Sequence, residues 1–425
     1  MSNSPVAQYM ALAEQRIGAA FVADGLYVHL VGGVQGPHTL TFGLRLYEPT
    51  AANIAKALRL KNAVEAALGD APVRIYTERG VVLVEAPSPW PAVIEARSLK
   101  GQHLAVPLGI TSLRLITGVD FSEPSQAHVV FVGPSGRGKS TAMRTALYHL
   151  ARQLTPWQAV FCVITFKPGD WRAVAELPHS WPLIIDPAEA ASALRYLVDD
   201  MHQRAREQIE VPHIFVVLDD LLNLLDAVDV VAELRQLASL GRAVGVHLVI
   251  GTQRLGKRGA GDAAVTGNIG TRLTFGTVDG QDAALFTGRG DSGAETLGRY
   301  LGDCLLVRDG QIVRLAAARV LDSDLDVLPR GPQLVKPWCT SAPVHQRGPY
   351  SLSAAPQPIN RPGAPGAPVQ GLLPRRAPTP DDVAEIRKQY SLLGSKNATV
   401  KACYGVKNTL TWHWVSQALE ESEVA

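Results

Sequence analysis

Residues 133–141 read Gly-Pro-Ser-Gly-Arg-Gly-Lys-Ser-Thr, which fits the pattern G-x-x-x-x-G-K-[ST] of a phosphate-binding loop. An apolar run at 128–132 predicts a strand before the loop, and a helical pattern begins near Lys139, as this motif requires. A strand, loop and helix of this kind belong to an α/β fold, so the motif constrains the whole architecture. The alternative is a glycine-rich loop that binds no nucleotide.

The loop offers three kinds of group to a nucleotide such as ATP. Its glycines let successive backbone N–H groups and the helix N-terminus face the β- and γ-phosphates. Lys139 adds a positive charge there, and the Ser140 hydroxyl is a ligand for Mg²⁺. The predicted nucleotide-binding residues are Gly133, Pro134, Ser135, Gly136, Arg137, Gly138, Lys139, Ser140 and Thr141.

Two further apolar runs end in polar residues. The run 214–218 leads into Asp219 and Asp220, and we expect Asp219 to hold Mg²⁺ and Asp220 to orient or deprotonate the attacking water. The alternative for this acidic pair is a helix start, where aspartate is favoured. The run 246–250 leads to Gln253, which is either a sensor of the γ-phosphate or part of a plain turn.

Apolar runs that alternate with helical patterns from residue 104 onward predict a parallel sheet covered on both faces. A smaller α/β domain precedes this sheet, with a predicted helix at 50–68. The predicted strands are 39–47, 73–76 and 81–85 in the small domain, then 128–132, 160–165, 183–186, 214–218, 246–251 and 273–275, and a closing hairpin at 305–308 and 311–315.

The composition excludes several classes of protein. Lys+Arg 41 against Asp+Glu 39 leaves a net charge of +2, so any DNA binding must come from local patches. The four cysteines have no metal-ligand spacing, and no apolar run approaches the roughly 18 residues that span a bilayer. We therefore expect a cytoplasmic protein without disulfides, a zinc site or a membrane segment.

Several short blocks accompany the loop in a fixed order. They are Leu177-Pro-His, Asp186-Pro, Gly241-Arg-Ala-Val-Gly-Val-His, Gly251-Thr-Gln-Arg, Asn268-Ile-Gly-Thr-Arg and Leu297-Gly-Arg. Together these blocks resemble the motor of the FtsK/SpoIIIE family of DNA translocases, over roughly residues 36–320. The resemblance implies a RecA-like ATPase that uses ATP and Mg²⁺, takes no other small-molecule substrate, and assembles into a ring, usually of six subunits, that pumps double-stranded DNA.

In a ring, an arginine of one subunit can complete the active site of its neighbour. Arg254 and Arg272 lie at predicted strand ends and are the candidates, with surface ion pairs as the alternative. The sequence also departs from the family: Asp220 stands where a glutamate is usual, and an insertion common before Val211 is missing. The membrane-spanning segment of the cell-division members is absent as well, which favours a plasmid, phage or accessory translocase.

We predict a small α/β domain at 1–103, the RecA-like motor at 104–328, a linker at 329–378 and a helix-turn-helix or winged-helix module at 379–425. Thirteen of the 29 prolines fall between Pro329 and Pro380, which indicates a flexible or polyproline linker. A proline-rich loop packed on the motor is the alternative.

The C-terminal module has five Lys and Arg and no acidic residue between 386 and 418, and its helical pattern resembles a helix-turn-helix. A small protein-docking module is the alternative. The predicted DNA-binding residues are Lys396, Lys401, Lys407, Asn408, Thr409, Thr411 and His413.

Three functions are consistent with these features. The first is an ATP-driven translocase of double-stranded DNA. The second is an ATP-dependent DNA-binding switch without processive motion, which the shorter side chain of Asp220 favours. The third is a viral packaging or plasmid conjugation pump built on the same motor.

Overall fold

The computed structural model describes residues 4–253, 265–267, 269–277, 280–290, 292–297, 299–331 and 334–339. The contacts within the chain divide it into one unit at Met1–Ala355 and a second at Pro356–Ala425, and all described residues belong to the first. Most of the predicted linker, the whole predicted C-terminal module at 379–425 and Arg254 therefore lie outside the described residues.

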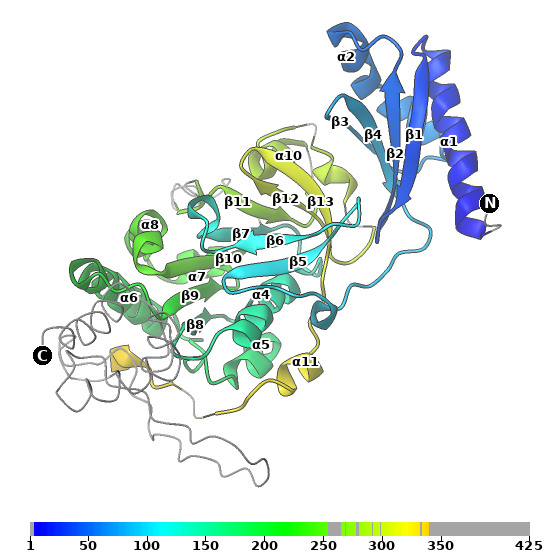
Figure 1. Ribbon diagram of the computed structural model, residues 1–425. Coiled ribbons are helices and arrows are strands. Elements are labelled where there is room, and N and C mark those ends of the chain that lie inside the picture. Colours follow the sequence, from blue (N-terminus) through cyan, green and yellow to red (C-terminus); the bar gives the residue numbers. More distant parts are fainter. Residues whose placement is uncertain are drawn as a thin grey trace, which may run out of the picture. The chain divides into compact units, whose positions relative to one another are not determined.

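The chain begins with a four-stranded antiparallel sheet of order β1-β2-β4-β3 (Figure 1). Apolar residues of α1, α3, β2 and β4 form its core, among them Phe21, Phe42 and Val64. The elements are α1 Pro5–Ala23, β1 Val28–Gln35, β2 Thr39–Leu46, α2 Ala51–Arg59, α3 Lys61–Ala67, β3 Arg74–Glu78 and β4 Val81–Pro87.

The predicted helix at 50–68 is wrong in one respect, because it is two helices. The chain leaves helical geometry at Leu60, where ψ is 11°, and α3 begins at the next residue. Ala57, Leu60 and Val64 are all buried in the same core, so the break keeps both short helices seated on the sheet.

A nine-stranded sheet of order β6-β5-β13-β12-β11-β7-β10-β9-β8 forms the larger part. Strands β11, β7, β10, β9 and β8 are parallel, and β12, β13, β5 and β6 extend the sheet in antiparallel fashion. The strands are β5 Ala105–Thr111, β6 Ile116–Asp120, β7 Val129–Val132, β8 Ala159–Ile164, β9 His213–Leu218, β10 Val246–Thr252, β11 Thr271–Thr274, β12 Asp303–Arg308 and β13 Gln311–Ala317.

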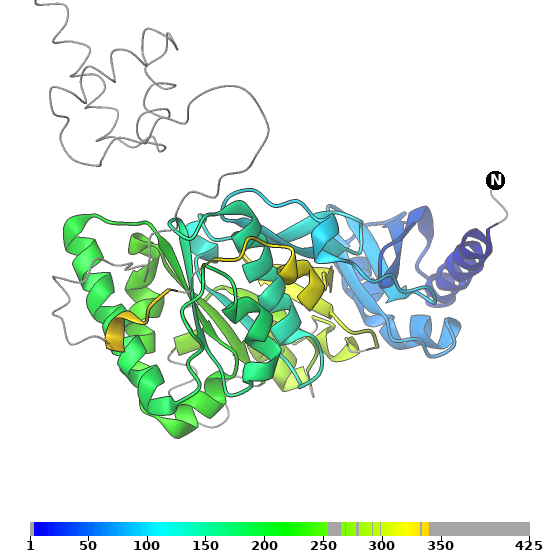
Figure 2. The same ribbon diagram turned by 90° about the horizontal axis from the view of Figure 1, so that it is seen from below.

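Helices cover both faces of the parallel strands (Figures 1 and 2). Alternate strand residues such as Phe131 and Val217 pack against α4 and α5, and their neighbours such as Val130 and Val216 pack against α6, α7 and α8. The helices are α4 Lys139–Gln153, α5 Pro168–Ala175, α6 Pro187–Glu207, α7 Leu221–Ala227, α8 Val231–Leu240, α10 Gly280–Thr287 and α11 Asp322–Asp326.

The structure confirms the predicted strands that became β7, β8, β9, β10 and β11 and the hairpin β12–β13. The prediction of a strand at 183–186 is wrong, because that segment makes only an isolated bridge between Ile184 and Ile164. Pro182 offers no N–H to a ladder, and Pro187 already begins α6 with Asp186 as its N-cap.

Candidate nucleotide-binding site

The loop at 133–138 connects β7 to α4 and leaves the start of that helix open. Gly138 occupies the N-cap with φ of 107°, a left-handed conformation that glycine adopts without strain, and no side chain caps the helix. The first turn of this 15-residue helix also carries no acidic residue. Its N–H groups and its dipole are therefore available to an anion such as a phosphate.

Lys139 folds back over the loop. Its ammonium donates to the carbonyl oxygens of Gly133 at 2.8 Å and Pro134 at 3.0 Å. The pKa of Lys139 is lowered, mainly because the ammonium is buried. The charge of Asp220 opposes this shift, and the charge of Lys167 adds to it. These two carbonyl bonds can be exchanged for phosphate oxygens, which are stronger partners because they are charged.

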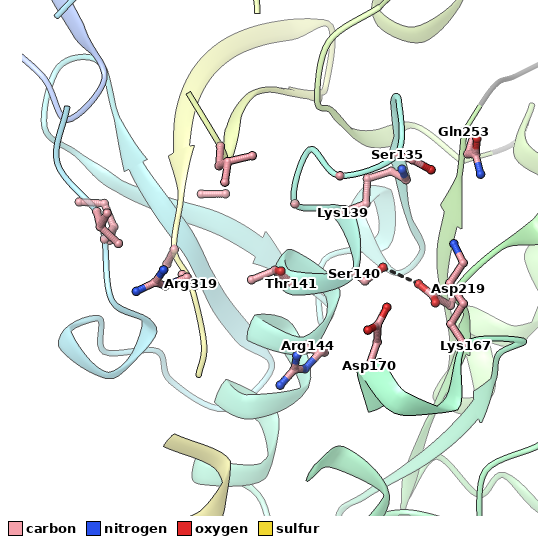
Figure 3. A pocket seen from close by; sticks show the side chains of 18 of the residues that line it. Ser135, Lys139, Ser140, Thr141, Arg144, Lys167, Asp170, Asp219, Gln253 and Arg319 are labelled. Atoms are coloured by element: carbon pink, nitrogen blue, oxygen red, sulfur yellow. Dashed lines mark hydrogen bonds between the residues drawn. The ribbon is translucent and has the colours of Figure 1, made fainter. Parts of the chain in front are cut away.

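Ser140 and Asp219 meet at the edge of the sheet. The Ser140 hydroxyl donates to Oδ1 of Asp219 at 2.7 Å (Figure 3). The Thr165 hydroxyl donates to Oδ2 of the same carboxylate at 3.2 Å. Asp219 follows β9, and a side chain at Gly251 of the adjacent β10 would come within 2.7 Å of the Asp219 carbonyl oxygen. Glycine at 251 thus lets the two strands bring their polar ends together.

Asp220 stands at the N-cap position of α7, yet its side chain does not cap the helix. Its Oδ2 accepts instead from Nδ2 of Asn223 at 2.8 Å and from Nε2 of Gln253 at 3.4 Å. The structure therefore brings Asp220 and Gln253 together, and the alternative of a capping aspartate does not describe the observed side chain.

These residues line a cavity of about 480 Å³ (Figure 3). One end is polar, with the loop, the two aspartates and Gln253, and the other carries aliphatic side chains. The lining residues are His38, Val93, Ile94, Ser135, Gly136, Gly138, Lys139, Ser140, Thr141, Arg144, Lys167, Asp170, Asp219, Asp220, Gln253, Leu301, Gly302, Ala317, Ala318 and Arg319.

Three predicted loop residues do not line the cavity but hold the residues that do. Gly133 and Pro134 supply the carbonyls that hold Lys139, and the Arg137 carbonyl accepts from the Gly302 N–H at 3.2 Å. The sequence interpretation also missed several lining residues. Lys167 could have been found, because it follows β8 at the sheet edge where α/β folds bind ligands.

Arg272 does not line the cavity. Its guanidinium donates to the carbonyl oxygens of Ile269 at 3.1 Å, Leu285 at 2.9 Å and Thr266 at 3.5 Å, and burial lowers its pKa. These bonds tie the segment before β11 to α10. A role for Arg272 in a neighbouring subunit's site stays a prediction, as does that of Arg254.

The donor set fits Mg²⁺. Ser140 and Asp219 present hard oxygen atoms 2.7 Å apart beside the anion site. No cluster of three or more His, Cys, Asp or Glu side chains able to hold a metal occurs among the described residues. Mg²⁺ is usually bound by one or two protein ligands, with phosphate oxygens and water completing its coordination.

Within the described part of the chain, no helix is both long enough and apolar enough to cross a membrane.

Comparison with known proteins shows what this chain is similar to. Residues 103–210 match the model of the FtsK/SpoIIIE family. The chain is 24% identical over 353 residues to the DNA translocase FtsK of Lactococcus lactis subsp. cremoris (strain MG1363), covering 72% of this chain and 45% of that protein. It is 26% identical over 339 residues to the DNA translocase FtsK of Chlamydia trachomatis serovar D, covering 69% and 41%.

These matches confirm the resemblance to the FtsK/SpoIIIE family, and the chain spans less than half the length of either relative. Among solved structures, the fold is similar to that of the pCW3 conjugation coupling protein TcpA in its monomer form with ATPγS. The TM-score is 0.50 at 19% identity, covering 73% of this chain and 96% of that one. The likeness supports a mixed α/β fold built on a mostly parallel sheet.

Proposed function

We propose that this FtsK/SpoIIIE relative is a RecA-like ATPase that translocates double-stranded DNA and works as a ring, most simply a hexamer. The observation that carries the proposal is the convergence of three parallel strands on one cavity. β7 leads to Lys139 and Ser140, β9 to Asp219 and Asp220, and β10 to Gln253. Binding, metal and hydrolytic groups are thus adjacent.

ATP binding begins with the loop. Lys139 exchanges the carbonyls of Gly133 and Pro134 for phosphate oxygens, and the open N-terminus of α4 donates backbone N–H groups to the same phosphates. Ser140 and Asp219 would hold Mg²⁺, which would neutralise charge that builds up on the phosphates.

Hydrolysis needs a positioned water. Asp220 is the group we assign to orient this water and accept its proton, because it lies beside the phosphate loop with one oxygen fixed by Asn223. Gln253 contacts the same oxygen. Release of the γ-phosphate therefore changes the surroundings of both side chains together.

The DNA partner is inferred from the relatives, which are named as DNA translocases. The basic module at 379–425 would load or orient the motor through Lys396, Lys401, Lys407, Asn408, Thr409, Thr411 and His413.

The test is ATP hydrolysis by the full chain with and without linear duplex DNA, alongside displacement of a triplex-forming strand. We expect duplex DNA to stimulate hydrolysis and ATP to drive displacement. Lys139→Ala should abolish both, whereas Lys100→Ala, an exposed lysine outside this cavity, should not. Absence of both DNA effects would overturn the translocase. Low turnover that Asp220→Glu restores, with nucleotide-dependent DNA affinity, would identify the switch instead.

A further inference from the structure

The end of the cavity away from Asp219 exposes apolar surface. Val93 is 65% exposed and Leu301 is 73% exposed, and both line the cavity together with Ala317 and Ala318. Exposed aliphatic side chains gathered in a concave site are typical of a surface that a ligand covers.

Arg319 lies on the same side as Val93. The Arg319 N–H donates to the Ile94 carbonyl at 2.7 Å, and Glu95 and Arg319 form a parallel bridge. Val93, Ile94, Ala318 and Arg319 all line the cavity, and of these Ile94 and Ala318 also pack against the apolar core.

The Arg319 side chain is available to a ligand. Its neighbour Glu95 is paired with Arg97 through bonds of 2.8 Å. Within the described part of the chain, no ion pair or side-chain hydrogen bond engages the Arg319 guanidinium. A planar guanidinium beside aliphatic side chains is suited to stack on a flat ring.

The direction of the cavity identifies that ring. In Figure 3, Thr141 lies between Arg319 on one side and Ser140 and Asp219 on the other. A triphosphate whose γ end lies at Asp219 and Gln253 therefore runs past Thr141 toward Arg319. Its nucleoside reaches the apolar end.

We propose that Val93, Leu301 and Arg319 form the nucleobase site, with the base lying on the two aliphatic side chains and against the Arg319 guanidinium. This inference rests on the proposed ATPase function and adds to it. Val93 belongs to the segment that joins the four-stranded sheet to the nine-stranded sheet, so the base contacts that connection directly.

The experiment compares two ligands that differ in the nucleoside. Binding of AMP-PNP and of inorganic tripolyphosphate, each with Mg²⁺, is measured by calorimetry on the full chain and its variants. Arg319→Ala should weaken AMP-PNP roughly tenfold and leave tripolyphosphate within about twofold. Arg319→Lys, which keeps the charge and loses the plane, should also weaken AMP-PNP. The matched control is Arg16→Ala, which removes an exposed arginine of α1.

A second pair of variants guards against an effect peculiar to Arg319. Val93→Ser and Leu301→Ser change exposed side chains, and we expect each to weaken AMP-PNP about three- to tenfold without affecting tripolyphosphate. Equal weakening of both ligands by Arg319→Ala would place the arginine on the phosphates and overturn the base site, as would no weakening of either. If the unaltered chain bound neither ligand, that result would contradict the proposed ATPase function itself.

Discussion

Asn223 donates a hydrogen bond of 2.8 Å from Nδ2 to Oδ2 of Asp220. Asp220 is the N-cap residue of α7, and Asn223 lies in the first turn of that helix. Gln253 contacts the same oxygen at 3.4 Å. One oxygen of the carboxylate is thus held by two amides. The proton of the attacking water is then expected to pass to the other oxygen, Oδ1.

Replacing Asn223 by alanine tests this positioning. The variant loses the shorter of the two bonds, so we expect kcat to fall about tenfold because the carboxylate samples other rotamers. Affinity for AMP-PNP should stay within about twofold, since Asn223 does not line the cavity. Steady-state hydrolysis and calorimetry give the two numbers. An unchanged kcat would show that Gln253 or the backbone suffices to orient Asp220.

Asp220→Asn separates hydrolysis from binding. The amide keeps the shape of the side chain but cannot accept the proton of water, so we expect hydrolysis to fall by about 10²- to 10⁴-fold. AMP-PNP binding should change less than about threefold. Single-turnover hydrolysis and calorimetry on the same preparation measure both. A variant that hydrolyses ATP at more than one tenth of the original rate would remove Asp220 from the role of base.

Asp219→Asn is expected to act on the metal. The neutral amide is a weaker ligand than a carboxylate, and Ser140 loses its charged acceptor. The Mg²⁺ concentration for half-maximal hydrolysis should rise about tenfold. A titration of activity with Mg²⁺ measures it, and Asp170→Asn, another carboxylate of the cavity, provides the comparison. If both variants shift the titration equally, the metal assignment to Asp219 does not hold.

The polar end of the site could be predicted because its residues follow apolar strands directly. Asp219 and Gln253 each end a run that reads as a buried strand, and parallel strands bring such ends together. The base end has no such local signal. Val93 and Arg319 are far apart in sequence and line one cavity because Arg319 bridges to Glu95 after β13 has paired with β5.

Two misses in the fold have local causes. Strands β5 and β6 contain Pro107, Gly109 and Gly118, residue types that weaken a strand pattern, and the ladder between them carries a bulge there. In α1 the buried stripe of Ala13, Ile17 and Phe21 is blurred by apolar residues that the structure leaves exposed. The exposed apolar residues of this helix are Tyr9, Leu12 and Val22.

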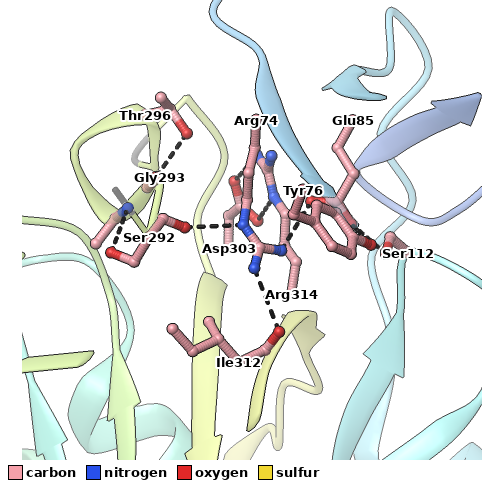
Figure 4. A network of polar contacts seen from close by, with 11 residues as sticks. Arg74, Tyr76, Glu85, Ser112, Ser292, Gly293, Thr296, Asp303, Ile312 and Arg314 are labelled. Atoms are coloured by element: carbon pink, nitrogen blue, oxygen red, sulfur yellow. Dashed lines mark hydrogen bonds and ion pairs between the residues drawn. The ribbon is translucent and has the colours of Figure 1, made fainter. Parts of the chain in front are cut away.

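A buried polar network joins the two sheets (Figure 4). Arg74 of β3 forms an ion pair with Glu85 of β4 at 3.3 Å. Its guanidinium also donates to the carbonyl oxygens of Ser292 at 2.8 Å and Ile312 at 3.3 Å. Arg74 lowers the pKa of Glu85, against the effect of burial, and Ser112 also donates to the carboxylate.

Arg74→Ala leaves the Glu85 carboxylate buried without its ion-pair partner. We expect the free energy of unfolding to fall by about 3–5 kcal/mol. Urea denaturation at pH 7.5 measures the loss. The exposed pair Arg97–Glu95 supplies the control, because Arg97→Ala should leave the free energy of unfolding nearly unchanged. If both variants cost the same, the buried pair contributes no more than a surface one.

Three buried or partly buried histidines, His128, His213 and His247, lie at the opposite edge of the sheet from the cavity. His247 Nδ1 is 2.9 Å from the Ala127 carbonyl and must donate to it, so Nε2 accepts from Nδ1 of His213 at 3.0 Å. His128 Nδ1 accepts from the Leu248 N–H at 3.0 Å. Burial is the main cause that lowers the pKa of His128 and His213 to about 4 and of His247 to about 3.

These shifts predict acid sensitivity. The unfolded chain protonates these imidazoles near pH 6.5, whereas the folded chain keeps them neutral to about pH 4. The unfolded state therefore binds more protons in this window. The contribution of these histidines to the free energy of unfolding should be fully present above pH 6.5. It should decrease as the pH drops toward 4, by up to about 1.4 kcal/mol per pH unit for each histidine.

His247→Phe tests this dependence, because phenylalanine keeps the ring that stacks on Phe215 at 4.8 Å but cannot titrate. At pH 7.5 the variant should be less stable by about 1–3 kcal/mol, since the His213 N–H and the Ala127 carbonyl lose their partner. Between pH 6.5 and 4.5 its stability should fall less steeply than that of the original chain. Urea denaturation across this range measures both slopes, with the exposed His29→Phe as the matched control. Parallel slopes for the His247 variant and the original chain would mean that His247 takes up its proton equally in the folded and unfolded states.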